Sequence, residues 1–135
     1  MNLFQLGDFT LRSGAESKWK IECDAFTDND WEALAVMAAE ILPPFTEVLG
    51  VPRGGLPFAA ALQKHIRDAP RTLLIAEDVC TTGGSMERFR ASITPNFVVP
   101  GMWVLGVCVF AREPEWPEWV QPLFSFNPIL SGAIA

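Results

Sequence analysis

The sequence predicts a single α/β domain built on a parallel sheet, and three observations lead to this prediction. A chain of 135 residues has the length of one domain. Half of its residues are hydrophobic and 19% are charged, so it can close a core, and disorder is excluded for most of it. Short apolar runs alternate with helical patterns, which is typical of a parallel sheet with right-handed crossovers.

The N-terminal third is predicted to hold a hairpin and a helix. Residues 9–11 and 18–23 read as two short strands joined by a turn. A helix follows, with Asp28 or Asn29 as its cap, and it ends before Pro43. Its apolar residues recur at three-and-four spacing and form the face expected to pack on the core: Trp31, Leu34, Ala35, Ala38, Ile41 and Leu42.

The remaining apolar runs are predicted to be the strands of the sheet. They cover residues 46–51, 72–76, 102–110 and 120–126. Helices are predicted over 56–66 and from about Met86, and Trp103 is expected in the core. The first two runs each end in a loop that contains a Gly-Gly pair. Because ligands of parallel sheets gather at the carboxyl ends of the strands, these two loops are the candidate sites.

The charge balance limits the kinds of partner. Sixteen acidic and ten basic side chains give a net charge of −6 and a pI near 4.7. Such a surface argues against binding to nucleic acid or to an anionic membrane. An anionic ligand would therefore have to be held by a local device.

The cysteines and the uncharged stretches indicate a cytoplasmic setting without a membrane span. Cys23, Cys80 and Cys108 are odd in number and lack the spacing of a zinc site or a disulfide framework, which favours a reducing compartment. No signal-peptide pattern opens the sequence. Residues 91–111 and 120–135 are uncharged, but proline and glycine interrupt both, so neither is expected to span a membrane as a helix.

The loop after the run at 72–76 carries the clearest chemistry. Two adjacent carboxylates precede a Thr/Gly/Ser turn that opens a helix. The backbone N–H groups and hydroxyls of this turn can hold a phosphate, and the carboxylates suit sugar hydroxyls or a metal bound through water. A ribose 5-phosphate has both features. The alternative is an ordinary capped helix with solvated acids. The residues are Glu77, Asp78, Thr81, Thr82, Gly83, Gly84 and Ser85.

Residues 77–85 resemble the signature of the type I phosphoribosyltransferases. That signature is an apolar strand, two acids, an aliphatic pair, and then Thr-(Thr/Ala/Ser)-Gly-(Gly/Thr)-(Ser/Thr). Here Glu77 stands where aspartate is more usual, and Cys80 where an aliphatic residue is common. The resemblance implies a Rossmann-like parallel sheet flanked by helices. It also implies that Glu77 and Asp78 bind the ribose hydroxyls of phosphoribosyl pyrophosphate (PRPP), and that residues 81–85 bind its 5-phosphate.

The loop after the run at 46–51 is similar to the pyrophosphate-binding loop of the same family. Arg53 supplies positive charge, and Gly54 and Gly55 let the backbone approach an anion closely. The resemblance implies a cis peptide bond between Pro52 and Arg53. Taken alone, the loop fits a proline-glycine turn with a surface arginine better, and it is the match of both loops in the right order that favours the resemblance.

The N-terminal segment is similar to the hood that orotate phosphoribosyltransferases place over the base. Residues 7–22 follow their pattern Phe-x-Leu-(Lys/Arg)-Ser-Gly-x-x-Ser-x-(Tyr/Trp), in which Arg12 is the basic residue. Arg112 matches an arginine that these enzymes place after the third strand, although Ala111 stands where they usually have aspartate. The resemblance implies that Arg12 and Arg112 bind an anionic, orotate-like base; the alternative is two surface arginines.

These matches divide the single domain, residues 1–135, into three parts. They are a hood-like hairpin over 1–27, a core over 28–113 and a C-terminal segment over 114–135. Only 23 residues separate Arg53 from Glu77. Family members with activity have an additional strand and a long mobile basic loop in this interval, which exclude water during the reaction.

Three functions therefore remain open at this point. The first is a glycosyltransferase that moves the phosphoribosyl group from PRPP to a nucleobase, most similar to the orotate enzymes, with Mg²⁺ bound mainly through PRPP and no metal held by the protein. The resemblance implies a homodimer. The second is an inactive regulatory module that binds PRPP or a nucleotide, and the third is a purely structural Rossmann-like domain.

Overall fold

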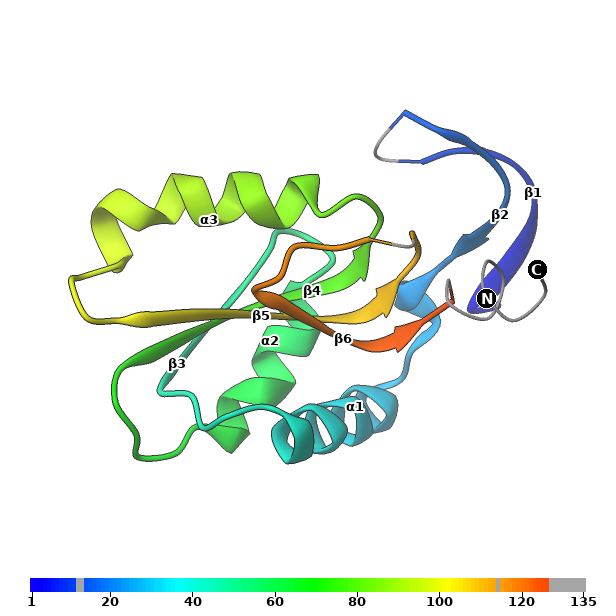
Figure 1. The fold of residues 1–135 in the computed structure, drawn as a ribbon. Coiled ribbons are helices and arrows are strands. Elements are labelled where there is room, and N and C mark those ends of the chain that lie inside the picture. The colour runs from blue at the N-terminus through cyan, green and yellow to red at the C-terminus, as the bar shows by residue number, and fades with distance from the viewer. Residues whose placement is uncertain (12–13, 114, 127–135) are drawn as a thin grey trace, which may run out of the picture.

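The computed structural model describes residues 1–11, 14–113 and 115–126, which form a hairpin beside a layered α/β body (Figure 1). The described residues hold a two-stranded antiparallel sheet, β1-β2, and a parallel sheet of four strands in the order β3-β4-β5-β6. Helices α1 and α2 cover one face of the parallel sheet, and α3 covers the other. This confirms the predicted fold class.

The hairpin is joined to the body by aromatic contacts. It consists of β1 (Phe4–Thr10) and β2 (Glu16–Ile21). The Phe4 ring lies 6.0 Å from the ring of Phe110, and the Trp19 ring lies 5.7 Å from that of Phe126, both edge to face. Such pairs add stability beyond the apolar area that they bury. The hairpin is therefore fixed over one end of the sheet.

Helix α1 (Asp28–Ile41) begins one residue earlier than a cap at Asp28 would allow, and two residues earlier than a cap at Asn29 would allow. Thr27 is the N-cap: its hydroxyl accepts from the Asp30 N–H at 3.1 Å, and its own N–H donates to Asp30 Oδ2 at 2.9 Å. This capping box satisfies two N–H groups at once, which explains why Thr27 displaces the predicted cap. Trp31 is buried as expected, but Ile41, in the last turn, is 55% exposed.

The rest of the core follows the predicted order of strands and helices. Helix α2 is followed by a short 3-10 helix, η2, which ends at His65. The elements are β3 (Glu47–Gly50), α2 (Leu56–Leu62), η2 (Gln63–His65), β4 (Thr72–Cys80), α3 (Gly84–Phe97), β5 (Trp103–Ala111) and β6 (Val120–Ser125). No helix among the described residues is long and apolar enough to cross a membrane.

Strands β4 and β5 differ from the sequence prediction at their ends. Strand β4 continues to Cys80 because its last residues still pair with β5, as Cys80 does with Ala111. The two acids therefore lie within the strand rather than beyond it. Trp103 was expected in the core but is 66% exposed, because it is the first residue of β5 and lies at the amino end of the sheet.

One of the two strand–helix–strand connections between β3 and β5 is left-handed, which is unusual in a parallel sheet. From β3 to β4 to β5 the chain steps in one direction across the sheet, yet α2 and α3 lie on opposite faces. The two crossovers must therefore have opposite hands. Figure 1 shows β4-α3-β5 as the right-handed one, so β3-α2-β4 is left-handed and the prediction of right-handed crossovers throughout is wrong. Helix α2 joins the face of α1, where Phe58 and Leu62 are fully buried.

Candidate functional site

A cavity of about 490 Å³ lies at the carboxyl ends of the central strands. The loop between β4 and α3 forms its floor, and the hairpin and the segment that follows it form its roof. This is the position predicted for a ligand of a parallel sheet. The lining residues include Thr10, Leu11, Lys20, Ile21, Glu22, Cys23, Asp78, Val79, Cys80, Thr81, Thr82, Gly83, Gly84, Ser85, Met86, Arg88 and Arg112.

The loop at 81–85 opens α3 with exposed donors. Gly83 is the N-cap in the left-handed region, with φ at +84°, and it provides no side chain to cap the helix. The first N–H groups of an α-helix have no partner inside the helix, and the Gly84 N–H is bonded only weakly, to Thr82 Oγ1 at 3.3 Å. Gly84, Ser85 and Met86 all line the cavity. This turn can therefore bind an anion.

A proline covers the far side of the same turn. A Cβ placed on Gly83 would lie 2.5 Å from Pro117 Cδ, well inside van der Waals contact. The segment that carries Pro117 is held on α3 by Trp119, whose Nε1 donates to Glu87 Oε1 at 2.9 Å. Only a glycine fits here, since both the backbone angle and the neighbouring ring exclude a side chain.

The two adjacent acids occupy different surroundings. Asp78 lines the cavity, and its Oδ1 accepts from the Val79 N–H at 2.7 Å. Glu77 is fully buried, and among the described residues it is not part of the lining. Its Oε1 accepts from the Asp78 N–H at 3.0 Å, and its Oε2 accepts from the Ser85 hydroxyl at 3.3 Å. Glu77 thus connects the second acid to the anion-binding turn.

The loop at 52–55 lies beside Asp78, outside the residues that line the cavity. It contains the cis peptide bond between Pro52 and Arg53, as predicted. Arg53 is exposed, and a Cβ on Gly54 would overlap the carboxylate of Asp78. The structure therefore brings the two predicted glycine loops together at the acid that they share.

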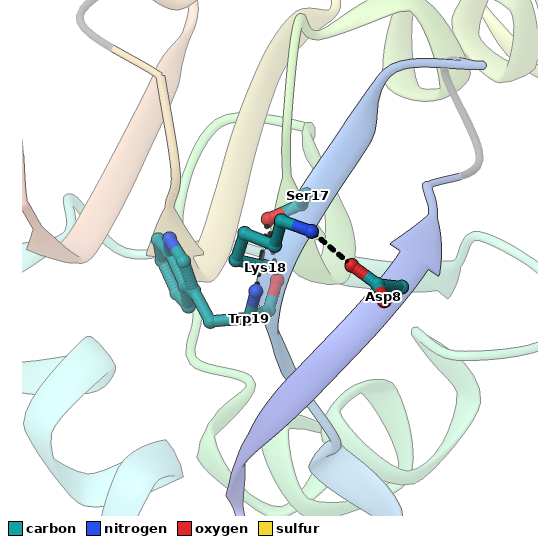
Figure 2. Close-up of polar contacts among 4 residues, drawn as sticks. All are labelled: Asp8, Ser17, Lys18 and Trp19. Atoms are coloured by element: carbon teal, nitrogen blue, oxygen red, sulfur yellow. Dashed lines mark hydrogen bonds and ion pairs between the residues drawn. The ribbon is translucent and has the colours of Figure 1, made fainter.

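Arg112 holds the roof of the cavity (Figure 2 shows the hairpin side of this contact). Its Nη2 donates to Ser17 Oγ and, at 3.1 Å, to the carbonyl oxygen of Trp19. Its guanidinium lies 3.5 Å above the centre of the Trp19 ring, and partial burial lowers its pKa. Arg112 therefore serves as a tether as well as a cavity residue. Arg12, its predicted partner, lies outside the described residues.

Neighbouring contacts hold the same part of the hairpin. Ser17 Oγ also donates to the carbonyl oxygen of Trp19 at 2.6 Å and accepts from the Trp19 N–H at 3.2 Å, while Lys18 pairs with Asp8 on the opposite strand (Figure 2). The Trp19 ring and the Lys18 ammonium come from successive residues of one strand, and strand side chains alternate between the two faces. The tryptophan is thereby fixed on the side where Arg112 meets it.

The three cysteines, of which Cys23 and Cys80 line the cavity, differ in acidity. Burial, followed by the charges of Asp78 and Glu22, raises the pKa of Cys23 far above the ordinary thiol value. A hydrogen bond with Cys108 lowers the pKa of Cys80, and the same contact raises the pKa of Cys108. Among the three thiols, Cys80 is therefore the one most readily ionised.

The described residues contain no group of three His, Cys, Asp or Glu side chains that could hold a metal ion.

Two basic residues of the cavity were not identified from the sequence. Lys20, on β2, pairs with Glu22 at 3.3 Å, and Arg88 lies on α3. Arg88 follows Ser85 by three residues and so shares its helical face, which is a signal that the spacing already contained. For Lys20 the signal was weaker, because a strand of alternating side chains does not tell which face meets a cavity.

Comparison with known protein families and with curated protein sequences finds no match. Solved structures do match. An orotate phosphoribosyltransferase from Aeropyrum pernix is 21% identical with a TM-score of 0.72, covering 97% of this chain and 92% of the other. The orotate phosphoribosyltransferase of Francisella tularensis is 18% identical with a TM-score of 0.60, covering 94% and 82%.

A UMP synthase from Leishmania donovani also aligns. It is 18% identical with a TM-score of 0.72, and the match covers 95% of this chain but 34% of the longer enzyme. At these identities the agreement concerns the path of the backbone. The chain therefore has the type I phosphoribosyltransferase fold, in a form that resembles the orotate phosphoribosyltransferases.

Proposed function

We propose that this protein is a phosphoribosyltransferase that transfers the phosphoribosyl group of PRPP to an orotate-like nucleobase and releases pyrophosphate. The observation that carries the proposal is the joining, in one cavity, of the Thr81–Ser85 turn with Asp78. The turn can bind the phosphate of a ribose 5-phosphate, and the carboxylate on the same cavity floor can bind the sugar hydroxyls. The fold and the resemblance of both loops to those of the family support it.

The 5-phosphate would be bound by the turn at 81–85. The N–H groups at the start of α3, among them that of Ser85, and the hydroxyls of Thr81 and Thr82 supply the donors. Ser85 is held in place by its bond to Glu77 at 3.3 Å. A terminal phosphate bound here would leave the sugar ring above Asp78.

The ribose hydroxyls would donate to Asp78. We assign Glu77 a positioning role, since it is fully buried and bridges the Asp78 N–H and the Ser85 hydroxyl. The two acids were predicted to act alike. Both are buried, but only Asp78 lines the cavity, and this difference favours separate tasks. The protein would thereby orient the ribose before any bond changes, which is a contribution from positioning and charge stabilisation.

The pyrophosphate would lie along the loop at 52–55, next to Asp78. Arg53 is exposed there and can pair with it. Asp78 and the pyrophosphate oxygens together are the oxygen donors that Mg²⁺ prefers, so we propose that the ion arrives with PRPP and contacts Asp78 through water. Mg²⁺ would neutralise the departing pyrophosphate.

The base would bind under the hairpin, where Arg112 lies above Trp19. The remaining N–H groups of its guanidinium suit the carboxylate of orotate, and Arg12 is proposed as the second cation. A homodimer and a cytoplasmic setting belong to the same proposal. A molar mass twice that of the chain by light scattering would support the homodimer.

The experiment is a turnover assay with PRPP, Mg²⁺ and several nucleobases, read as loss of base and release of pyrophosphate. We expect turnover with orotate, and a loss of at least about tenfold in Asp78→Asn, because an amide cannot accept as a carboxylate does. Asp68→Asn, in the exposed turn before β4, is the matched control and should behave as the wild type. Absence of turnover with every base would refute the catalytic proposal.

A second candidate is the module that binds PRPP or a nucleotide without reaction. One observation favours it: residues 56–71 contain α2, η2 and a turn, and no additional strand or long loop that could close over the cavity. Calorimetric binding of PRPP without turnover, abolished in Asp78→Asn, would assign the protein to this class.

A further inference from the structure

Three cationic side chains line the described part of the cavity, and two of them already bond to other residues of the protein. Lys20 pairs with Glu22 at 3.3 Å. Arg112 donates to Ser17 and Trp19. Arg88 is the third, and no ion pair joins it to another residue in the described part of the chain. Its charge is therefore available to a ligand.

The guanidinium of Arg88 lies over the anion-binding turn. Arg88 is on the second turn of α3, and Nη1 is 3.1 Å from the point where a Cβ of Gly84 would stand. Long side chains on a helix point back toward its N-terminus, which accounts for this reach. The cation consequently lies beside the first residues of α3, Gly84 and Ser85, on the floor of the cavity.

This arrangement is electrostatically costly without an anion. The N-terminus of a helix carries a partial positive charge, so a cation beside it is repelled. The acid next to Arg88, Glu87, does not offset this, because its carboxylate accepts from Trp119 Nε1 on the segment outside the cavity. A bound dianion would turn both positive features into attractions.

Resting on the proposed function, we propose that Arg88 is the counter-ion of the ligand's terminal phosphate and makes the cavity select phosphate monoesters over the corresponding neutral sugars. An arginine can present two parallel N–H groups to phosphate oxygens. In a protein with a net charge of −6, Arg88 would supply the local positive charge that an anionic ligand needs. Free ribose 5-phosphate, PRPP and nucleoside 5-monophosphates would share this contact.

The test measures calorimetric affinity for ribose 5-phosphate and for ribose in four proteins. They are the wild type, Arg88→Ala, Arg88→Lys and the matched control Arg90→Ala. Arg90 has the same charge on the same helix, but it stacks on Trp119 at 4.7 Å and is not part of the cavity lining. Arg88 is exposed and alanine favours helix, so the variant should fold, which circular dichroism checks.

We expect Arg88→Ala to bind ribose 5-phosphate about 10- to 100-fold more weakly than the wild type, the range for a lost hydrogen bond between charged groups. Arg88→Lys should recover part of the loss, and Arg90→Ala should change affinity less than about threefold, since a distant surface charge is screened. Ribose should bind weakly to all four proteins, with no difference between them.

Each result bears on the inference separately from the proposed function. Equal affinity in Arg88→Ala and the wild type, or equal losses in Arg88→Ala and Arg90→Ala, would overturn the role of Arg88 and leave the transfer reaction in place. Selective loss in Arg88→Ala together with no consumption of PRPP would support Arg88 and refute the transfer. A wild type that binds ribose 5-phosphate no better than ribose would overturn both.

Discussion

Replacing Gly83 with alanine tests whether the turn at 81–85 is held in shape by its backbone angle and by its neighbour. Gly83 has φ at +84°, and Gly101, at the turn before β5, has φ at +86°. A Cβ on Gly83 would lie 2.5 Å from Pro117 Cδ, whereas a Cβ on Gly101 would meet nothing within 4 Å. An alanine at either position would therefore have an unfavourable backbone angle, but only an alanine at residue 83 would also overlap a neighbouring ring.

The expected destabilisation follows from these two contributions. The left-handed conformation costs an alanine about 1–2 kcal/mol at either position. At Gly83, overpacking against Pro117 adds about 1–3 kcal/mol. We therefore expect the free energy of unfolding to fall by about 1–2 kcal/mol in Gly101→Ala and by about 2–5 kcal/mol in Gly83→Ala.

Urea denaturation at 25 °C measures both values. Pro117→Ala removes the ring atoms that a Cβ at residue 83 would meet, so the double variant should recover the part of the loss caused by overpacking. Binding of ribose 5-phosphate should weaken in Gly83→Ala and stay unchanged in Gly101→Ala. Equal destabilisation at the two glycines, or no recovery in the double variant, would show that Pro117 does not determine the turn.

Three further predictions concern the cavity. Gly54→Ala should displace the carboxylate of Asp78 and weaken binding of ribose 5-phosphate about tenfold or more, measured by calorimetry; unchanged affinity would contradict the proximity of the two loops. Arg112→Lys should lose the stacking on Trp19 and speed amide hydrogen exchange in β2, and unaltered exchange would mean that the aromatic contacts alone hold the hairpin. All three thiols are buried, so iodoacetamide should react slowly, and it should modify Cys80 first as pH rises, because Cys80 lines the cavity and its lowered pKa supplies thiolate earlier. Ribose 5-phosphate should protect Cys80, and peptide mapping that finds another cysteine modified first would reject this order.

The order of the elements was decided locally, and the sequence was sufficient to predict it. Apolar runs of strand length, three-and-four spacing in α1 and glycine pairs at two strand ends each depend on residues close together in the chain. The same is true of the turn at 81–85. The cis peptide bond at Pro52 followed from family resemblance, and the structure contains it.

Two elements differ from the prediction at their ends because another hydrogen-bond partner was available. Thr27 formed a capping box with Asp30 in place of the predicted cap, and continued pairing with β5 extended β4 past the acids. Both outcomes depend on which hydrogen-bond partner is available, and two neighbouring residues of similar propensity cannot be ranked without that knowledge. Trp103 is exposed because it is the first residue of β5, at the amino end of the sheet, and hydropathy does not reveal where along a strand the burial begins.

Only the tertiary structure decided the hand of the β3-α2-β4 crossover, the absence of the buried Glu77 from the described cavity lining that Asp78 joins, and the stacking of Arg112 on Trp19. Each depends on which surface a distant segment covers, and adjacent side chains with the same chemistry, such as the two acids, receive different surroundings from it. The sequence by itself determined which chemical groups stand at the strand ends, because covalent order places them there. Packing across the sheet determined which of those groups reach the cavity.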